Sequence, residues 1–299
     1  MIDEQRRGTL FGAAAYLSWG LFPLYWPLLQ PARPLEILAH RVVWSLLVCA
    51  GLLIMLPGAR AVFPLGGRRL RLLAIAACTL ALNWGVYIYG VNSNQVVETS
   101  LGYFINPLVT VSLGVLVLGE TLRWRQWAAL AVACIAVVVL TVDYGRPPLI
   151  ALALAFTFAA YALLKKRAGV GAVESLAVET AVLFLPAVGF LVVLGGRGEA
   201  HLNGVAHGLL LMGAGVVTAL PLLAFGAAAR RVPLTTLGLL QYLAPTLQFF
   251  IGVVVQHEPM PAVRLVGFGL IWVALALFTA EALSHRRRQL QLAAEASAV

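Results

Sequence analysis

The sequence predicts an all-α membrane protein with ten transmembrane helices, arranged as two inverted five-helix halves. Three observations predict this fold class: few charges, ten long apolar runs, and two halves related by a constant residue interval. Hydrophobic residues make up 61% of the chain and charged residues 11%, and the mean hydropathy is +0.92. A soluble domain carries about 25% charged residues, so no soluble fold could cover this much apolar surface. The surrounding solvent is therefore predicted to be lipid.

Ten apolar runs of spanning length follow one another with short loops between them. A spanning α-helix needs about 20 apolar residues, and the runs lack the alternation of a transmembrane β-barrel. The expected spans of the first half are Thr9–Leu29, Leu35–Leu56, Leu70–Val91, Val96–Leu118 and Trp124–Val142. Those of the second half are Pro147–Leu164, Val173–Leu194, Val205–Ala229, Leu234–Val255 and Ala262–Leu283. Residues 1–143 and 144–299 are thus the expected domains.

Positive charges fall mostly on one side of these spans. Of the 21 Lys and Arg residues, Arg41 lies inside a span and the loops of one side hold only four. Those four are Arg33, Arg146, Arg197 and Arg264. Because Lys and Arg collect in cytoplasmic loops, the opposite side and both termini are expected in the cytoplasm. A net charge of +9 in a soluble protein would suggest nucleic acid, but charges in membrane loops predict no nucleic-acid partner.

An interval of 138 residues relates the two halves, and both contain the pattern P-x(6)-G-x(5)-E. Because each half has five spans, the second half enters the membrane in the opposite orientation. Such inverted-topology repeats recur in secondary transporters. The residue pairs related by this interval include Pro107 and Pro245, Gly114 and Gly252, Glu120 and Glu258, Arg41 and Glu179, and Asp143 and Glu281.

Five segments carry a resemblance to a known family. They are AYLSWGLFPLYWPLL (Ala15–Leu29), EILAHRVVWSLL (Glu36–Leu47), LNWGVYIYGVN (Leu82–Asn92), ETSLGYFINPL (Glu98–Leu108) and TALPLLAFGAAARRVPLTTLGLLQYLAPTLQF (Thr218–Phe249). From Gly8 to Glu281 the chain resembles the RarD branch of the EamA group, within the drug/metabolite transporter (DMT) superfamily. The resemblance implies a ten-span permease of the inner membrane with two EamA repeats. It implies little about the substrate.

Three titratable side chains lie well inside expected spans: His40, Arg41 and Glu179. A charge at a span centre costs about 2.5–3.5 kcal/mol, so such groups suggest function. Arg41 and Glu179 lie at similar depths from opposite surfaces, which leaves two interpretations open. They form a static buried bridge, or each lines one mouth of a transport pathway, with Arg41 attracting an anionic group. Glu179 and His40 are the candidates for proton coupling, although His40 equally suits an interhelical hydrogen bond.

Prolines at matching positions interrupt the fourth and ninth spans. Pro107 and Pro245 each free the carbonyl of the residue four positions earlier. Interrupted spans in corresponding positions of two halves are a strong sequence pointer to a transporter site. We therefore expect hinges at both prolines and a polar site near them, with a simple packing kink as the alternative. The expected site residues in these two spans are Tyr103, Asn106, Gln241, Tyr242 and Gln248.

The third span adds Asn83, Trp84 and Tyr87 to the expected substrate pathway. Asn83 and Tyr87 are four residues apart and share one helix face, and Trp44 and Trp19 suit additional aromatic walls. Trp26, Trp124 and Trp127 lie near span ends, where tryptophan commonly anchors a helix at the membrane interface or simply packs.

The preferred function is a secondary transporter that moves a small organic metabolite or drug by alternating access. Its expected partners are a small-molecule solute and the lipid bilayer. No phosphate-binding Gly-rich loop and no G-x-S elbow occurs, so no catalytic residue, metal or cofactor is expected. An uncoupled facilitator or channel-like pore is the main alternative, and a lipid scramblase or membrane enzyme a lesser one. A homo-oligomer is left open, because the Gly8–Gly12 G-x-x-x-G spacing is too common to decide.

Overall fold

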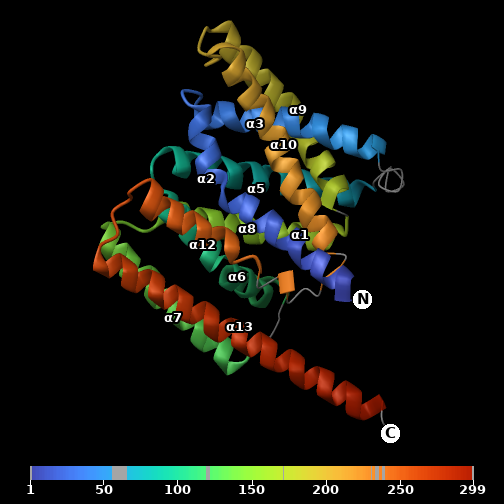
Figure 1. Ribbon diagram of the computed structural model, residues 1–299, viewed down its shortest axis with the longest axis vertical. Coiled ribbons are helices and arrows are strands. Elements are labelled where there is room, and N and C mark those ends of the chain that lie inside the picture. The colour runs from blue at the N-terminus through green and yellow to red at the C-terminus, as the bar shows by residue number, and fades with distance from the viewer. Residues whose placement is uncertain are drawn as a thin grey trace.

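The computed structural model describes residues 2–55, 66–118, 122–170, 172–229, 231–232, 236–237 and 240–297. Within these residues the fold is helical and contains no β-strand. Glu120 and Leu234, which the sequence places at the end of the fourth span and the start of the ninth, lie outside them. The helices run back and forth through one packed bundle (Figure 1).

Helices in the first half follow the expected spans closely. They are α1 (Ile2–Gly20), α2 (Phe22–Tyr25), the 3-10 turn η1 (Trp26–Leu29), α3 (Pro34–Met55), α5 (Gly67–Asn92), α6 (Val96–Leu118) and α7 (Trp124–Tyr144). The expected first span, Thr9–Leu29, is not one helix. Pro23 and Pro27 are the second residues of two new short elements there, because a proline in the first turn of a helix sacrifices no hydrogen bond.

Helices in the second half also match the expected runs, with one difference. They are α8 (Leu149–Ala168), α9 (Ala172–Gly196), α10 (Gly204–Ala229), α12 (Leu243–Phe250), the π-helical turn η2 (Ile251–Val255) and α13 (Ala262–Ser297). The ninth run is not one helix: a turn at Gln241 and Tyr242 precedes α12, and Pro245, near the centre of that run, lies in the first turn of α12. Proline is tolerated at that position. Pro107, in contrast, lies inside the continuous helix α6.

Seven of the described helices are long and apolar enough to cross a membrane. Their spanning parts are Pro34–Met55, Gly67–Asn92, Val96–Leu113, Trp124–Tyr144, Glu174–Gly196, Gly204–Ala228 and Ala262–Ser284. Two shorter apolar helices, Leu149–Lys165 and Leu243–Val255, accompany them. Large apolar side chains remain exposed on the spanning helices, for example Leu185 on α9 at 77%. An apolar outer surface is what lipid, rather than water, tolerates.

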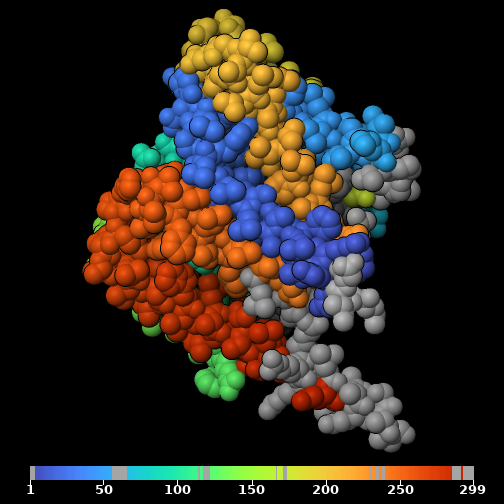
Figure 2. Space-filling model, viewed as in Figure 1, coloured from blue at the N-terminus to red at the C-terminus, as the bar shows by residue number. Residues whose placement is uncertain are grey.

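The helices pack as a set of neighbouring pairs. α7 and α13 lie side by side along one edge of the molecule (Figure 1). α3 packs against α9 and α10, while α5 packs against α8 and α9. α1 packs against α10 and α12, and these three share the face shown in Figure 2. α6 packs against α8 and α12. The interior between α3, α5, α8 and α10 holds the polar residues described next.

Candidate substrate site around Arg41

Arg41 is a buried charge on the largely apolar helix α3, and only 4% of the residue is exposed. Its Nε donates a hydrogen bond of 2.9 Å to the hydroxyl oxygen of Thr218 on α10. The Thr218 hydroxyl itself donates to the carbonyl of Ala214, at 2.8 Å. Its oxygen therefore presents a lone pair to the guanidinium. α10 thus fixes one edge of the guanidinium, and its two terminal nitrogens make no hydrogen bond to a described residue.

Three aromatic rings surround the same guanidinium. Its central carbon lies 3.7 Å from the ring centroid of Trp84, 5.0 Å from that of Trp26 and 5.7 Å from that of Phe22. A cation over an aromatic face gains about 0.5–2 kcal/mol, with the larger values where water is excluded. The rings therefore stabilise the positive charge of Arg41 without neutralising it.

No carboxylate pairs with Arg41 in the part of the chain that the structure describes. A buried charge without an ionic partner is costly, and only one hydroxyl and the rings offset that cost here. The indole nitrogen of Trp26 and the hydroxyl of Tyr87 are buried in the same cluster and also make no hydrogen bond to a described residue. Free donors beside an unpaired guanidinium are suited to binding a small anionic group.

A series of aromatic contacts leads from this site toward α8. The rings of Tyr87 and Tyr103 meet edge to face, with centroids 5.6 Å apart. Tyr103 meets Phe158 at 6.1 Å, and Phe158 meets Tyr161 at 6.0 Å. Edge-to-face rings at these distances attract one another. They form a continuous row of rings from the Arg41 site to Tyr161, whose hydroxyl bonds to Glu179.

Asn83 attaches this row of rings to α8. Its amide nitrogen donates to the carbonyl of Leu154 at 3.0 Å and to the hydroxyl oxygen of Thr157 at 2.9 Å. The amide oxygen accepts a longer hydrogen bond, 3.4 Å, from the hydroxyl of Tyr103. Because Asn83 is 1% exposed, these bonds are shielded from water and hold α5, α6 and α8 together.

Glu179 lies at the other end of the aromatic series and is 1% exposed. The hydroxyl of Tyr161 donates to its Oε2 at 3.1 Å, and Nζ of Lys165 lies 3.5 Å from its Oε1. Lys165 also donates to the hydroxyl of Ser175. α3 and α9 are neighbours, yet Arg41 and Glu179 take different partners. The structure therefore contains no direct Arg41–Glu179 bridge.

Comparison with known proteins assigns the chain to a family. The sequence profile of the EamA-like transporter family matches residues 6–142. Protein RarD of Streptomyces exfoliatus is 54% identical over 290 residues, which cover 96% of this chain and 92% of that protein. The chain belongs to the RarD branch of the EamA-like transporter family. Protein RarD of Escherichia coli (strain K12) is 39% identical over 289 residues, covering 95% of this chain and 98% of that protein.

One further relative supports this membership in the EamA family, and one solved structure shares the fold. A Bacillus subtilis (strain 168) protein named uncharacterized transporter YojE is 40% identical over 293 residues, covering 95% of this chain and 97% of that protein. A protein solved by crystallography shares the fold with a TM-score of 0.61 at 19% identity, over 90% of this chain and 96% of that one. With several apolar spanning helices, this EamA-family chain is a multi-pass membrane transporter, a class that favours a non-enzymatic role.

The structure brings only some of the expected site residues together in this EamA-family transporter. Asn83, Trp84, Tyr87 and Tyr103 gather near Arg41, as described above. Other expected residues have different neighbours. Tyr242 packs against the cluster formed largely by α6, α7 and α13, and Gln248 donates to the carbonyl of Trp19 at 3.1 Å. Asn106 accepts a bond of 3.5 Å from Thr110, Gln241 lies in the turn before α12, and His40 Nδ1 is buried with no bond to a described residue.

Several residues of the site were missed by sequence reasoning. Thr218 is one threonine in an apolar run, and it meets Arg41 across 177 residues of sequence, so no local pattern indicates the contact. Lys165 resembles an ordinary basic residue at a helix end. Trp26 was expected only to anchor a span end or to pack; it packs in the interior, 0% exposed and beside Arg41, whereas Trp124 is 73% exposed. The break after α1 turns Trp26 inward.

Proposed function

We propose that this chain is a secondary transporter for small organic solutes that carry an anionic group, and that Arg41 binds this group. The observation that carries the proposal is the burial of Arg41 with one neutral hydrogen-bond partner and no carboxylate. A carboxylate or similar anion could accept hydrogen bonds from both terminal nitrogens at once. The rings of Trp84 and Trp26 would then hold the apolar part of the solute.

We also propose ten spans in two inverted halves, residues 1–143 and 144–299. Under the 138-residue interval, α1, α3, α5, α6 and α7 correspond to α8, α9, α10, α12 and α13. The helix pairs then fall into matching sets. α1 packs on α10 as α8 packs on α5, α1 packs on α12 as α8 packs on α6, and α3 packs on α10 as α9 packs on α5. A two-fold axis in the membrane plane would produce this pairing.

Ion pairs between α7 and α13 support the same arrangement. Asp143 near the end of α7 accepts a hydrogen bond of 2.7 Å from Nε of Arg264 near the start of α13. In the reverse sense, Glu281 of α13 lies 3.5 Å from Arg125 and 3.1 Å from Arg123, at the start of α7. Asp143 and Glu281 are related by the 138-residue interval, although their arginine partners are not. An inverted repeat would place one such carboxylate at each end of the α7–α13 pair.

Alternating access would deliver the solute to the buried site. Because Arg41 is only 4% exposed, we propose that the two halves move to admit a solute. We propose hinges at Pro107 and Pro245, and a proton-carrying role for Glu179, with His40 as the other candidate. Glu179 is supported by its burial beside Lys165 and Tyr161. An uncoupled facilitator would need neither titrating group.

The proposed location is the inner membrane, with both termini in the cytoplasm. The strong bias of Lys and Arg toward one set of loops supports this orientation. Whether the protein acts alone or as a homo-oligomer is a separate matter, on which the proposal does not depend.

The deciding experiment is flux into proteoliposomes, with aromatic and aliphatic carboxylates compared with their neutral amides. We expect the carboxylates to be transported and the amides to be excluded, because only the anion pairs with Arg41. Arg41→Gln should abolish carboxylate flux, and Arg41→Lys should retain part of it. A pH gradient should change the rate in the wild type if transport is proton-coupled. Equal flux of acids and amides would contradict the proposed role of Arg41.

A further inference from the structure

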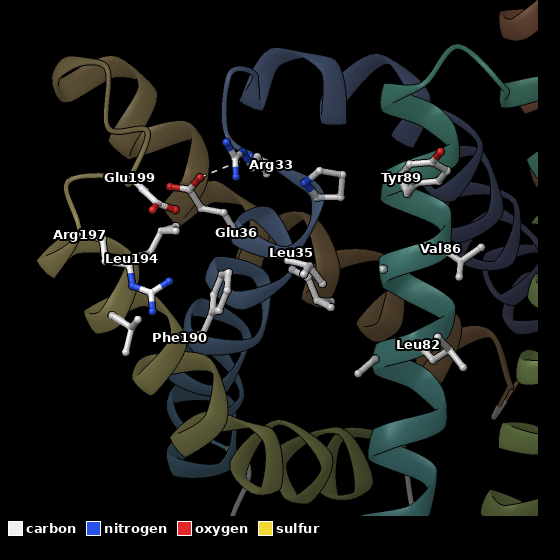
Figure 3. Close-up of a pocket in the computed structure, with 15 residues that line it drawn as sticks. Arg33, Leu35, Glu36, Leu82, Val86, Tyr89, Phe190, Leu194, Arg197 and Glu199 are labelled. Carbon is white, nitrogen blue, oxygen red and sulfur yellow. Dashed lines mark hydrogen bonds between the residues drawn. The ribbon is translucent and has the colours of Figure 1, made fainter.

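A lateral groove of about 780 Å³ lies outside the Arg41 site. α3 and α9 line one side of it and α5 the other (Figure 3). Its apolar lining includes Leu35, Leu82, Val86, Phe190 and Leu194. Leu35 is 62% exposed and Leu82 57% exposed, and all three helices are spanning helices. The groove therefore opens toward lipid rather than toward the interior of the bundle.

The depth of the groove corresponds to part of one leaflet. Along α5 it runs from Tyr89 to Ala81, which is roughly 12 Å at about 1.5 Å per residue. The hydrocarbon core of a bilayer is about 30 Å thick, so the groove stays within one half of it. Tyr89 is half exposed at the charged end, and tyrosine is common at headgroup level.

Charged groups of both signs gather at that end of the groove, as Figure 3 shows. Arg33, Arg197 and Glu199 are exposed, and their side chains form no ion pair with another described residue. Glu36 is different, since its carboxylate accepts the backbone N–H of His201 at 2.8 Å and contacts the His201 ring nitrogen at 2.9 Å. Two guanidiniums and one carboxylate thus remain available at the headgroup level.

We propose that this groove is a binding site for a phospholipid whose headgroup combines a phosphate with an ammonium group, as in phosphatidylethanolamine. Arg33 and Arg197 bind the phosphate, for which guanidinium groups are well suited. Glu199 binds the ammonium group, and one acyl chain lies along Leu82 and Phe190. Arg41 and the rings of Trp84 and Trp26 do not line this groove. Leu38 of α3 lies close to Gly85 of α5 at its wall, since a Cβ added at Gly85 would lie 3.4 Å from Leu38. The inference does not depend on the proposed substrate.

Native mass spectrometry of the full chain tests this site with three added lipids of identical acyl chains. The lipids are phosphatidylethanolamine, phosphatidylglycerol, which lacks the ammonium group, and diacylglycerol, which lacks the phosphate. We expect retention to fall in that order. Arg33→Gln with Arg197→Gln should lower phospholipid retention by about tenfold, and the matched Arg33→Lys with Arg197→Lys should preserve it. Glu199→Gln should abolish only the preference for phosphatidylethanolamine over phosphatidylglycerol.

The apolar part of the groove is tested with one variant and one matched control. Leu82→Trp fills the groove and should reduce retention of all three lipids, whereas Leu209→Trp, at an exposed apolar position on α10, should not. Melting temperatures establish that each variant is folded. Equal retention of phosphatidylethanolamine and diacylglycerol by the wild type would overturn the proposal. The proposal would also be overturned if the arginine-to-glutamine variant retained as much phospholipid as the wild type. If that variant in addition lost solute flux, the groove would be a solute entrance.

Discussion

The guanidinium carbon of Arg41 lies 3.7 Å from the centroid of the Trp84 ring, closer than to either of the other two rings around it. Arg41 is on α3 and Trp84 is on α5, so the contact joins two spanning helices. A ring face stabilises a cation but supplies no net negative charge. The guanidinium is therefore held in place while its charge remains available to an anionic solute.

Replacing Trp84 should weaken solute binding more than it disturbs the fold. Trp84→Leu keeps an apolar side chain but removes the ring beside Arg41, a loss of about 0.5–2 kcal/mol. We expect KM for an anionic solute to rise by about 2- to 30-fold, with a smaller rise for Trp84→Phe. The concentration dependence of flux measures this. Trp127→Leu is the control, because Trp127 on α7 is 53% exposed; an unchanged KM in Trp84→Leu would argue against the site.

Arg41 and Glu179 should contribute independently to folding. Arg41 bonds to Thr218, and Glu179 to Tyr161 and Lys165, so neither loses a partner when the other is neutralised. The changes in unfolding free energy of Arg41→Gln and Glu179→Gln should therefore add in the double variant to within about 0.5 kcal/mol. Denaturant unfolding of both singles and the double gives the coupling energy. A coupling above about 1 kcal/mol would mean that the two side chains touch.

Sequence reasoning located the helices well because apolar runs and their ends are local signals. The bounds of α6 agree with the expected span, and α3 and α10 agree to within one residue. It also selected Arg41 and Glu179, since a charge in lipid is costly wherever it lies. It could not assign their partners, because Thr218 and Lys165 come from other helices whose packing is not a local property. It did not assign Trp26 to the site, because the break within the first span turns this ring toward Arg41.

Neutralising Glu179 should destabilise the protein through Lys165. Because Lys165 keeps 20% of its side chain exposed, the decrease in unfolding free energy should be somewhat smaller than the roughly 3–5 kcal/mol expected when a fully buried ion pair loses one partner. Lys165→Met in the Glu179→Gln background should restore most of the stability, as thermal unfolding would show. If Glu179 carries the proton, this rescued double variant should transport without responding to a pH gradient. A retained pH response would assign coupling to another group, such as His40.

The contacts at the two ends of the α7–α13 pair should be similar in strength and separate from solute binding. Asp143→Asn removes the ion pair with Arg264, and Glu281→Gln removes those with Arg123 and Arg125. Each should lower the unfolding free energy by about 1 kcal/mol, because the arginines are partly exposed. Neither α7 nor α13 supplies a residue described around Arg41, so KM should stay unchanged. A raised KM in either variant would connect this pair to the transport pathway.

The orientation of the chain can be tested with single cysteines at the ends of three helices, in a background whose native cysteines are alanine. Gly196 ends α9 and Val263 begins α13, both on the side with few basic residues, whereas Gly169 follows α8 on the basic side. Because basic loops stay in the cytoplasm, an impermeant maleimide added to intact spheroplasts should label cysteines at 196 and 263 but not at 169. Permeabilised cells are the control, in which all three should react. Labelling at 169 alone in intact spheroplasts would reverse the orientation, and labelling at 196 and 169 alike would mean that α9 does not span.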